Sequence, residues 1–184
     1  MDTLKTAICL IPTDELTLTD QRTFREAALA AGERMARDQI ASGGDYIARP
    51  PQNIADFGCA LDQWNTAPLL AVGTPYSVFQ AIAAPVLGNR QVVVWYKIGI
   101  ETAPPPVSLV TFQEGAAGRT TFAVIDLEQV YAKQQTEGYL TEPIVYPNGS
   151  QMLINAICRI FTGVFCRLQL GGFVIEPVGP QISG

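Results

Sequence analysis

The chain has 184 residues, 48% of them hydrophobic, and a formal net charge of −5. This length suits one domain with an appendage, and the composition suits a chain that buries a core rather than a disordered one. Its 12 basic residues are scattered along an acidic chain, which excludes the clustered Lys and Arg of a general phosphate-binding surface. We therefore expect no nucleic-acid partner.

Residues 1–45 predict an N-terminal arm followed by a helix. The arm covers residues 1–18, opens too polar for a secretory signal, and has the apolar side chains Leu4, Ile8, Leu10 and Ile11. Apolar residues then recur at steps of three and four, which predicts a helix over about residues 19–41, capped by Thr19 or Asp20. The apolar stripe of this helix is narrow and alanine-rich. It suits close contact either with another chain or with the protein's own β-domain.

Residues 46–88 predict an extended, proline-rich connector. Proline at this density confines any strand to an edge, so strands broken by loops and a long wandering connection both fit. No charged residue lies between Asp62 and Arg90, but Pro68, Pro75 and Pro85 would break a spanning helix, so we expect no membrane contact. We expect much of this segment, like residues 1–18, to be ordered chiefly by contacts with other chains.

Residues 89–184 predict a β-sandwich domain. Runs rich in β-branched and aromatic residues indicate strands at 92–100, 107–114, 120–127, 144–146, 152–160 and 164–175. One or two further strands upstream would complete an eight-stranded jelly roll. The expected fold class is therefore mainly β, a jelly-roll-like antiparallel sandwich with an N-terminal arm and one α-helix.

The clearest local pattern predicts a β-hairpin around Phe161-Thr162-Gly163, with Gly163 in the left-handed conformation. With that loop as the centre, apolar residues face one another in pairs on a single strand face. The predicted core face consists of Ile154, Ala156, Cys158, Ile160, Val164, Cys166, Leu168 and Leu170. Upstream, Pro147-Asn148-Gly149-Ser150 tolerates positive φ and predicts a turn.

The four cysteines, Cys9, Cys59, Cys158 and Cys166, form no CxxC pair. In the predicted hairpin Cys158 lies opposite Cys166, so a cross-strand disulfide and two reduced core thiols are both open. Reduced thiols are the more common state in a cytosolic protein, and we favour them here.

The chain contains no histidine, which removes Ser-His-Asp and Cys-His catalysis and His-ligated metals. Phosphate-binding glycine loops are absent as well. Asp126 and Glu128 share a predicted strand face, with Glu114 nearby, but no pattern places two carboxyl groups in a cleft. Positions at solvated strand edges account for these three carboxylates. We expect no enzyme, no cofactor and no metal site.

The strand face opposite the predicted core has the composition of a protein interface. Leu153, Ile157 and Phe165 alternate there with Arg159 and Arg167, and mixed aliphatic, aromatic and arginine surface is typical of interfaces. A second layer within the same domain explains the pattern equally well.

An N-terminal arm and helix, a connector and a C-terminal sandwich together resemble virion structural proteins of tailed bacteriophages, particularly capsid cement or decoration proteins. The residues that carry the resemblance are 164–177, similar to the closing strands of small phage jelly rolls, and 142–150, similar to the preceding strand. The resemblance implies a homo-oligomer, often a trimer, assembled in the host cytoplasm. It would sit in the virion against the major capsid protein or neighbouring virion proteins and stabilise contacts between capsid subunits. No functional residue is carried over, because no family motif is matched position by position.

The alternative is a carbohydrate- or protein-binding sandwich that acts as an adaptor of a phage tail or fibre. Sugar sites usually expose aromatic platforms, and the candidates here are Trp64, Tyr76, Trp95 and Tyr139. A carboxylate hydrolase is the third hypothesis.

Overall fold

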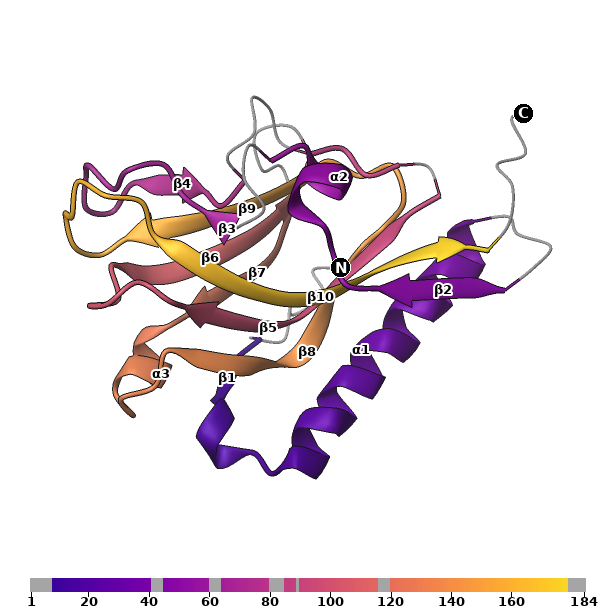
Figure 1. Ribbon diagram of the computed structural model, residues 1–184, viewed down its shortest axis with the longest axis horizontal. Helices are drawn as coiled ribbons and strands as arrows, with labels where there is room; N and C mark the ends of the chain where they lie inside the picture. Colours follow the sequence, from indigo (N-terminus) through magenta and orange to yellow (C-terminus); the bar gives the residue numbers. More distant parts are fainter. Residues whose placement is uncertain are drawn as a thin grey trace, which may run out of the picture.

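The structure is a computed structural model that describes residues 8–40, 45–59, 64–79, 85–88, 90–115 and 120–178. Within these ranges the chain folds into two antiparallel sheets packed face to face, with one long helix on the outside (Figure 1). The helical elements are η1 (Thr13–Glu15), α1 (Leu18–Gln39), α2 (Asn53–Phe57) and α3 (Glu128–Tyr131).

The first sheet has the strand order β1-β8-β5-β10-β2, with the short β3 also paired to β10. Its strands are β1 (Leu10–Pro12), β8 (Glu137–Tyr146), β5 (Val92–Ile100), β10 (Arg167–Pro177), β2 (Tyr46–Arg49) and β3 (Trp64–Asn65). The second sheet has the order β4-β9-β6-β7. Its strands are β4 (Pro75–Ser77), β9 (Met152–Cys158), β6 (Val107–Glu114) and β7 (Thr120–Asp126).

The strand order is that of a jelly roll. When β1 and β3 are set aside, β2-β10-β5-β8 faces β4-β9-β6-β7, and the chain changes sheet at every connection except the β6–β7 hairpin. This order is the eight-stranded double sheet in which two Greek keys wrap around one core. The predicted fold class is confirmed. One or two strands were expected upstream of residue 90, and β2 and β4 complete the jelly roll there, with β1 and β3 in addition.

The main core lies between the two sheets and is built by side chains that alternate along each strand. Trp95, Tyr146 and Phe112 are among its largest fully buried members. Trp95 packs against Trp64, with ring centroids 5.4 Å apart and planes nearly perpendicular, and Phe57 contacts both rings. The core therefore contains an aromatic cluster that joins both halves of the sequence.

This cluster corrects the expectation for residues 46–88. The described part of that segment is an integral part of the sandwich, not a connector ordered chiefly by other chains. It supplies β2, β3 and β4 to the two sheets. Its buried core side chains are Phe57, Cys59, Trp64, Leu69, Val78, Phe79 and Leu87. The prolines lie outside the central strands, where a missing N–H breaks no ladder bond.

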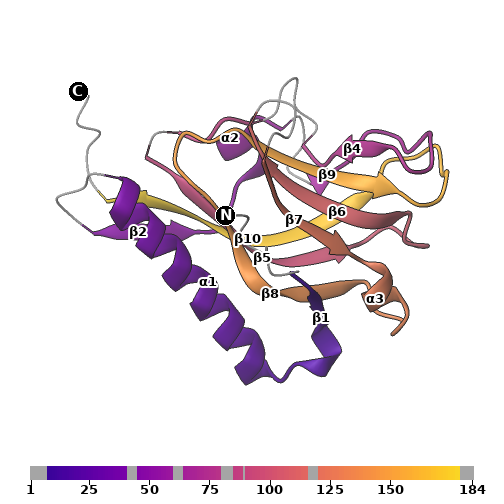
Figure 2. The ribbon, with the colours of Figure 1, turned by 180° about the vertical axis from the view of Figure 1, so that it is seen from behind.

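Helix α1 packs on the outer face of the first sheet, which decides between the two partners considered for its small-residue stripe (Figure 2). Ala28, Gly32 and Ala36 are buried there against Val94 and Ile175. The helix begins earlier than expected: Thr17 is the N-cap, and Asp20 closes a capping box with it. That box satisfies N–H groups that a helix start leaves unpaired.

The hairpin predicted around residues 161–163 does not form. Strand β9 pairs with β6 and β4, whereas β10 pairs with β5, β2 and β3, so residues 159–166 cross from one sheet to the other. Most of the predicted core face is nonetheless buried: Ile154, Ala156, Cys158, Cys166, Leu168 and Leu170. The alternation of apolar residues along a strand predicts which face of that strand is buried. It does not predict the pairing partner, because two strands of opposite sheets that face each other across the core show the same alternation as two strands paired in one sheet.

Ile160 and Val164 are the wrong part of that prediction, because they are 39% and 52% exposed. They belong to the crossing loop rather than to a strand, so the period of two no longer applies to them. The turn chemistry was right: Gly163 has φ +67° and Gly149 has φ +69°. All four cysteines are free thiols.

The N-terminal arm is also corrected where the structure describes it. Leu10 is only 5% exposed, and β1 pairs with β8 in register Leu10 to Leu140. Residues 10–12 of the arm are therefore an edge strand of the protein's own sheet. Leu4 lies outside the described residues.

Candidate protein-interaction surface

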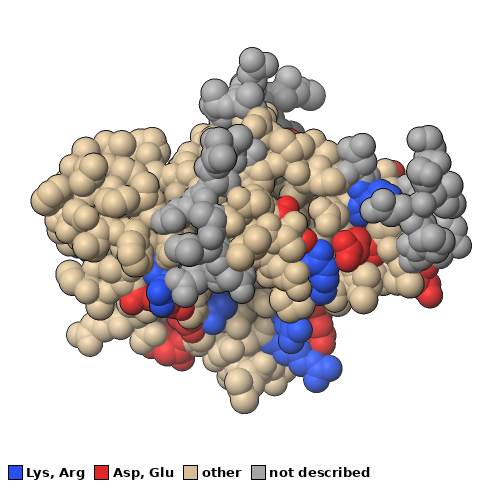
Figure 3. Space-filling model, turned by 45° about the horizontal axis from the view of Figure 1, so that its top comes forward, with Lys and Arg blue, Asp and Glu red and all other residues tan. Residues whose placement is uncertain are grey.

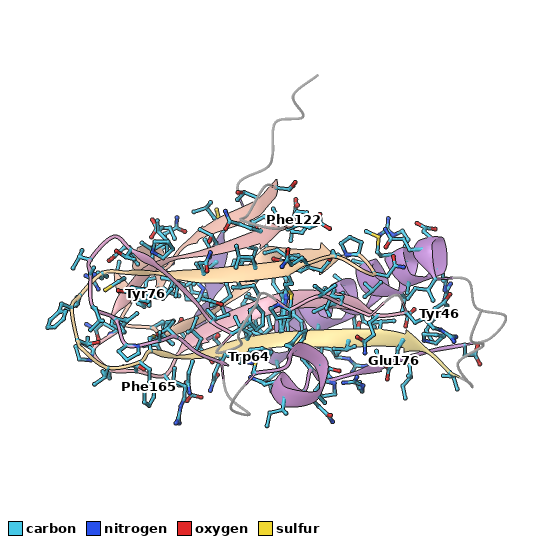
Figure 4. The ribbon with its side chains drawn as sticks, turned by 90° about the horizontal axis from the view of Figure 1, so that it is seen from above. Tyr46, Trp64, Tyr76, Phe122, Phe165 and Glu176 are labelled. Carbon is cyan, nitrogen blue, oxygen red and sulfur yellow. The ribbon has the colours of Figure 1, made fainter. Side chains whose placement is uncertain are left out.

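Six of the 12 large hydrophobic side chains that are exposed among the described residues lie at one end of the sandwich, which we call the apolar tip. It is formed by the loop at residues 66–74, between β3 and β4, and the loop at residues 159–166, between β9 and β10. Its large side chains are between 39% and 65% exposed: Leu70, Val72, Ile160, Phe161, Val164 and Phe165. Figure 4 shows Phe165 and Tyr76 toward this same end.

The two loops of the apolar tip are bonded to each other through their backbones. Leu69 N–H donates to the Val164 carbonyl at 3.0 Å, and Gly163 N–H donates to the Leu69 carbonyl at 3.1 Å. The Leu69 side chain is fully buried beneath them. At the base, Cys166 N–H donates to Thr66 Oγ1 at 2.9 Å. The apolar side chains thus project from a fixed frame rather than from two independent loops.

Tyr76 holds the first loop from below. Its hydroxyl oxygen accepts the backbone N–H groups of Leu70 at 2.9 Å and Ala71 at 3.0 Å, while its ring packs against the core. Gly73, with φ +78°, turns the chain in a conformation that favours glycine, and its N–H bonds the Cys158 carbonyl at 2.8 Å. Tyr76, one of the candidate sugar platforms, therefore serves as a structural support of this loop.

Apart from Arg159 at its margin, the apolar tip has no charged side chain. Residues 66–74 and 160–166 contain no Asp, Glu, Lys or Arg, and Figure 3 shows this end without blue or red atoms in that view. The flanking arginines are paired: Arg159 lies 2.9 Å from Glu128 and above the ring of Tyr131. Arg167 lies 3.5 Å from Glu101. Charge depletion at the centre with paired charges at the rim is the composition of a protein interface.

The outward face of the second sheet adjoins the apolar tip. Pro75 pairs with Ile157, and Ile157 pairs with Leu109, so their side chains form a row next to the tip. Farther along β9, Asn155 Nδ2 donates to Gln113 Oε1 at 3.4 Å. Helix α1 packs on the opposite sheet, and the outward β9 side chains remain half-buried.

The predicted interface residues are distributed over several places, because the hairpin that would have aligned them is absent. Leu153 and Ile157 lie on the outward face of the second sheet, Arg159 and Phe165 lie at the tip, and Arg167 lies on the outer face of the first sheet. In the arm, Ile8 packs against the core, Leu10 is a core residue, and Ile11 is half-buried.

Sequence reasoning missed most of the tip. Ile160 and Val164 were assigned to the buried face, while Leu70, Val72 and Phe161 were not singled out. The signal was nevertheless present in the sequence, since Leu70 and Val72 belong to the long uncharged stretch before Arg90. Sequence alone did not indicate that this stretch lies beside residues 159–166.

The chemistry-bearing side chains have structural partners. Asp126 Oδ1 accepts the N–H of Glu128 at 2.9 Å at the start of α3, and Glu128 is paired with Arg159. Among the described residues no group of three or more Cys, Asp or Glu is arranged to hold a metal ion. Burial raises the pKa of the Cys166 thiol to about 12 and that of Cys59 to about 11, so neither is an activated nucleophile.

The aromatic platforms of the alternative hypothesis are mostly enclosed. Trp95 is fully buried and Tyr139 is 8% exposed. Trp64 is equally buried but lines a surface cavity. One of the proposed platforms is therefore placed where a small ligand can reach it.

Comparison with protein-family models, with curated proteins and with solved structures found no match to this chain. None of the described helices is both long enough and apolar enough to traverse a lipid bilayer.

Proposed function

We propose that the protein is a non-enzymatic structural protein of a virus particle, a capsid cement or decoration protein of a tailed bacteriophage. In this role it stabilises contacts between capsid subunits and works without a cofactor. The jelly-roll strand order supports the proposal at the level of fold analogy, because this architecture recurs in viral capsid proteins. The same architecture also occurs in lectins and cupins, so the argument for function depends on the surface.

The observation that carries the proposal is the apolar tip. Exposed apolar surface of this kind marks a contact site, and burying it contributes about 25 cal/mol per Å² removed from water. Because the two loops are bonded to each other at Leu69, little conformational entropy is lost when a partner covers them. A protein partner with an uncharged, apolar recess suits this surface best.

A symmetric shell would amplify a modest contact. Each copy presents one tip, and many copies held on one particle add their contacts through multivalency. The protein would act as a homo-oligomer, such as a trimer, seated on the major capsid protein after assembly in the host cytoplasm. The outward face of the second sheet, with Leu153 and Ile157, provides the adjoining surface for a neighbouring copy.

The test is association with particles of the protein's source. The mass of the purified protein is measured by light scattering, alone and after mixing with particles that lack it. We expect the wild type to bind particles, and we expect Phe161→Asp and Val164→Asp to weaken binding about tenfold or more, as for a hot-spot residue. Leu18→Asp is the matched control, because Leu18 is 84% exposed at the start of α1, where an acid is tolerated.

The melting temperature of each variant establishes that the fold is retained. Particle binding that survives both tip substitutions would reject the tip as the contact site. A wild-type protein that stays monomeric and never associates with particles would reject the structural role as a whole.

A further inference from the structure

A second recognition site lies on the outer face of the first sheet, on the half that α1 leaves uncovered. It is a cavity of about 400 Å³, within the range of about 300–1,000 Å³ that is usual for small-ligand sites. Lys97, Glu101, Arg167 and Gln169 line it together with Asn53 and Trp64. The side chains come from β5, β10, the start of α2 and β3, so both halves of the sequence build it.

The charged groups of the cavity are fixed and mutually balanced. Gln169 Nε2 donates to Glu101 Oε1 at 2.7 Å, and Arg167 lies 3.5 Å from the other oxygen of the same carboxylate. Lys97 pairs with Glu137 at 2.9 Å. Each cation of the lining is thus paired with a carboxylate, which gives a field that favours a neutral ligand with both donors and acceptors over an ionised one.

Asn53 is the feature that points to a ligand. It is 5% exposed, it lines the cavity, and its Nδ2 has no hydrogen-bond partner among the described residues. Buried polar groups are almost always hydrogen-bonded, and an exception calls for a cause such as an unfilled site. A ligand hydroxyl reached by a small rotation of this amide would satisfy it.

Trp64 adds the apolar element. Its ring is held by Phe57 at 5.4 Å and by Phe79 at 5.7 Å between centroids, so its orientation is set before any ligand arrives. Figure 4 shows Trp64 near the middle of the sandwich, away from the end where Phe165 lies. The cavity and the apolar tip are therefore different surfaces, and they adjoin at the pair formed by Arg167 and Glu101.

We propose that this cavity binds a neutral saccharide unit. A sugar ring presents hydroxyl groups that both donate and accept, which match the carboxylate of Glu101, the amides of Gln169 and Asn53, and the cations of Arg167 and Lys97. Its C–H groups can pack against the part of the Trp64 side chain that lines the cavity. The site does not depend on the capsid role proposed above, and it would give a particle-bound protein a means of contacting glycans.

The experiment uses the full chain and soluble monosaccharides: glucose, galactose, mannose and N-acetylglucosamine as neutral probes, and glucuronic acid as the charged probe. Binding is followed by two-dimensional amide NMR titration. We expect at least one neutral sugar to shift the amides of Lys97 and Gly171 saturably, and we expect glucuronic acid to bind more weakly.

Glu101→Gln should weaken that binding about tenfold or more, the loss expected for a charge-assisted hydrogen bond. Gln169→Ala, at an exposed position, gives a second test that does not depend on the ion pair. Glu33→Gln is the matched control, because Glu33 pairs with Arg37 on the exposed side of α1; its affinity should stay within twofold of wild type.

Three results would overturn the proposal. One is the absence of saturable shifts with every neutral sugar at tens of millimolar. Another is full affinity in both Glu101→Gln and Gln169→Ala. The third is stronger binding of glucuronic acid than of any neutral sugar, which would replace the neutral saccharide by an anion. None of these results bears on particle association, so the two proposals fail separately.

Discussion

Gly32 shows how one residue sets the position of a whole helix. A Cβ at this position would collide with Ile175 Cδ1 and Val94 Cγ2, both on the outer face of the first sheet. Glycine costs helix stability, but here it lets α1 approach the strands closely. The buried neighbours Ala28 and Ala36 continue the same flat stripe. The small-residue stripe is thus a docking surface within the chain.

The cysteines give a prediction at the residue scale. Burial raises the pKa of Cys59 to about 11 and that of Cys166 to about 12, and it also raises the pKa of Cys158. Cys9 is the exposed thiol. We expect a thiol reagent at pH 8 to label Cys9 alone in the folded protein and all four cysteines in urea. Peptide mass mapping identifies the labelled positions, and rapid native labelling of Cys166 would contradict the assignment of its burial.

The same thiols make stability dependent on pH in the alkaline range. Their folded pKa values lie above the unfolded value of about 8.5, so their contribution is complete below that pH. It is lost as the pH rises toward the folded pKa values of about 11 and 12. Urea titrations between pH 7 and pH 10 should therefore show a falling free energy of unfolding. Replacing Cys59 and Cys166 by alanine should flatten that fall.

At the scale of elements, the connections decide the surface. Residues 159–166 carry the chain from the second sheet to the first, and the crossing exposes Phe161 and Val164 at the end of the sandwich. The loop at 66–74 runs beside it and is bonded to it through Leu69. Neither loop alone would present a continuous apolar surface. The two loops lie side by side because both cross between the sheets next to each other: β3 pairs with β10 in the first sheet, and β4 pairs with β9 in the second.

Tyr76→Phe tests whether the first loop is held as described. The substitution removes the hydroxyl that accepts the N–H groups of Leu70 and Ala71 and should cost about 1–2 kcal/mol of stability. Hydrogen exchange at these two amides should become faster while the sheets stay protected. Tyr46→Phe is the control, because it removes a single hydroxyl bond to the Ile40 carbonyl. Unchanged exchange at Leu70 in Tyr76→Phe would show that the loop is ordered by other contacts.

At the scale of the whole molecule, the sandwich is one cooperative unit. The core of the C-terminal strands is completed by Phe57, Trp64 and Leu69 from the N-terminal half. The N-terminal part also supplies the edge strands of the first sheet: the short strands β1 and β2 lie outside the long strands β8 and β10. An exposed strand edge is a site for aggregation. We therefore expect residues upstream of 89 to be required for folding.

A fragment of residues 89–184 tests this dependence. We expect it to aggregate or stay unfolded, because it lacks β2, β4 and the aromatic partners of Trp95. The full chain should unfold in urea in a single transition that is the same by circular dichroism and by tryptophan fluorescence. A fragment that unfolds in a cooperative thermal transition would contradict this prediction. It would show that residues 89–184 form an independent sandwich and that the N-terminal part is an appendage.

The sequence by itself determined the fold class, the long helix and most of the buried face of β9 and β10. These features follow from local periodicity and turn chemistry, which each segment carries regardless of its neighbours. Only the tertiary structure decided which strands pair, because the period of two is equally satisfied by a hairpin and by two strands facing across a core. The tertiary structure also decided which residues come together at the two proposed sites. The apolar tip joins residues 66–74 to 159–166, and the sugar-sized cavity joins Asn53 and Trp64 to Glu101 and Gln169, contacts between distant segments that no local pattern encodes.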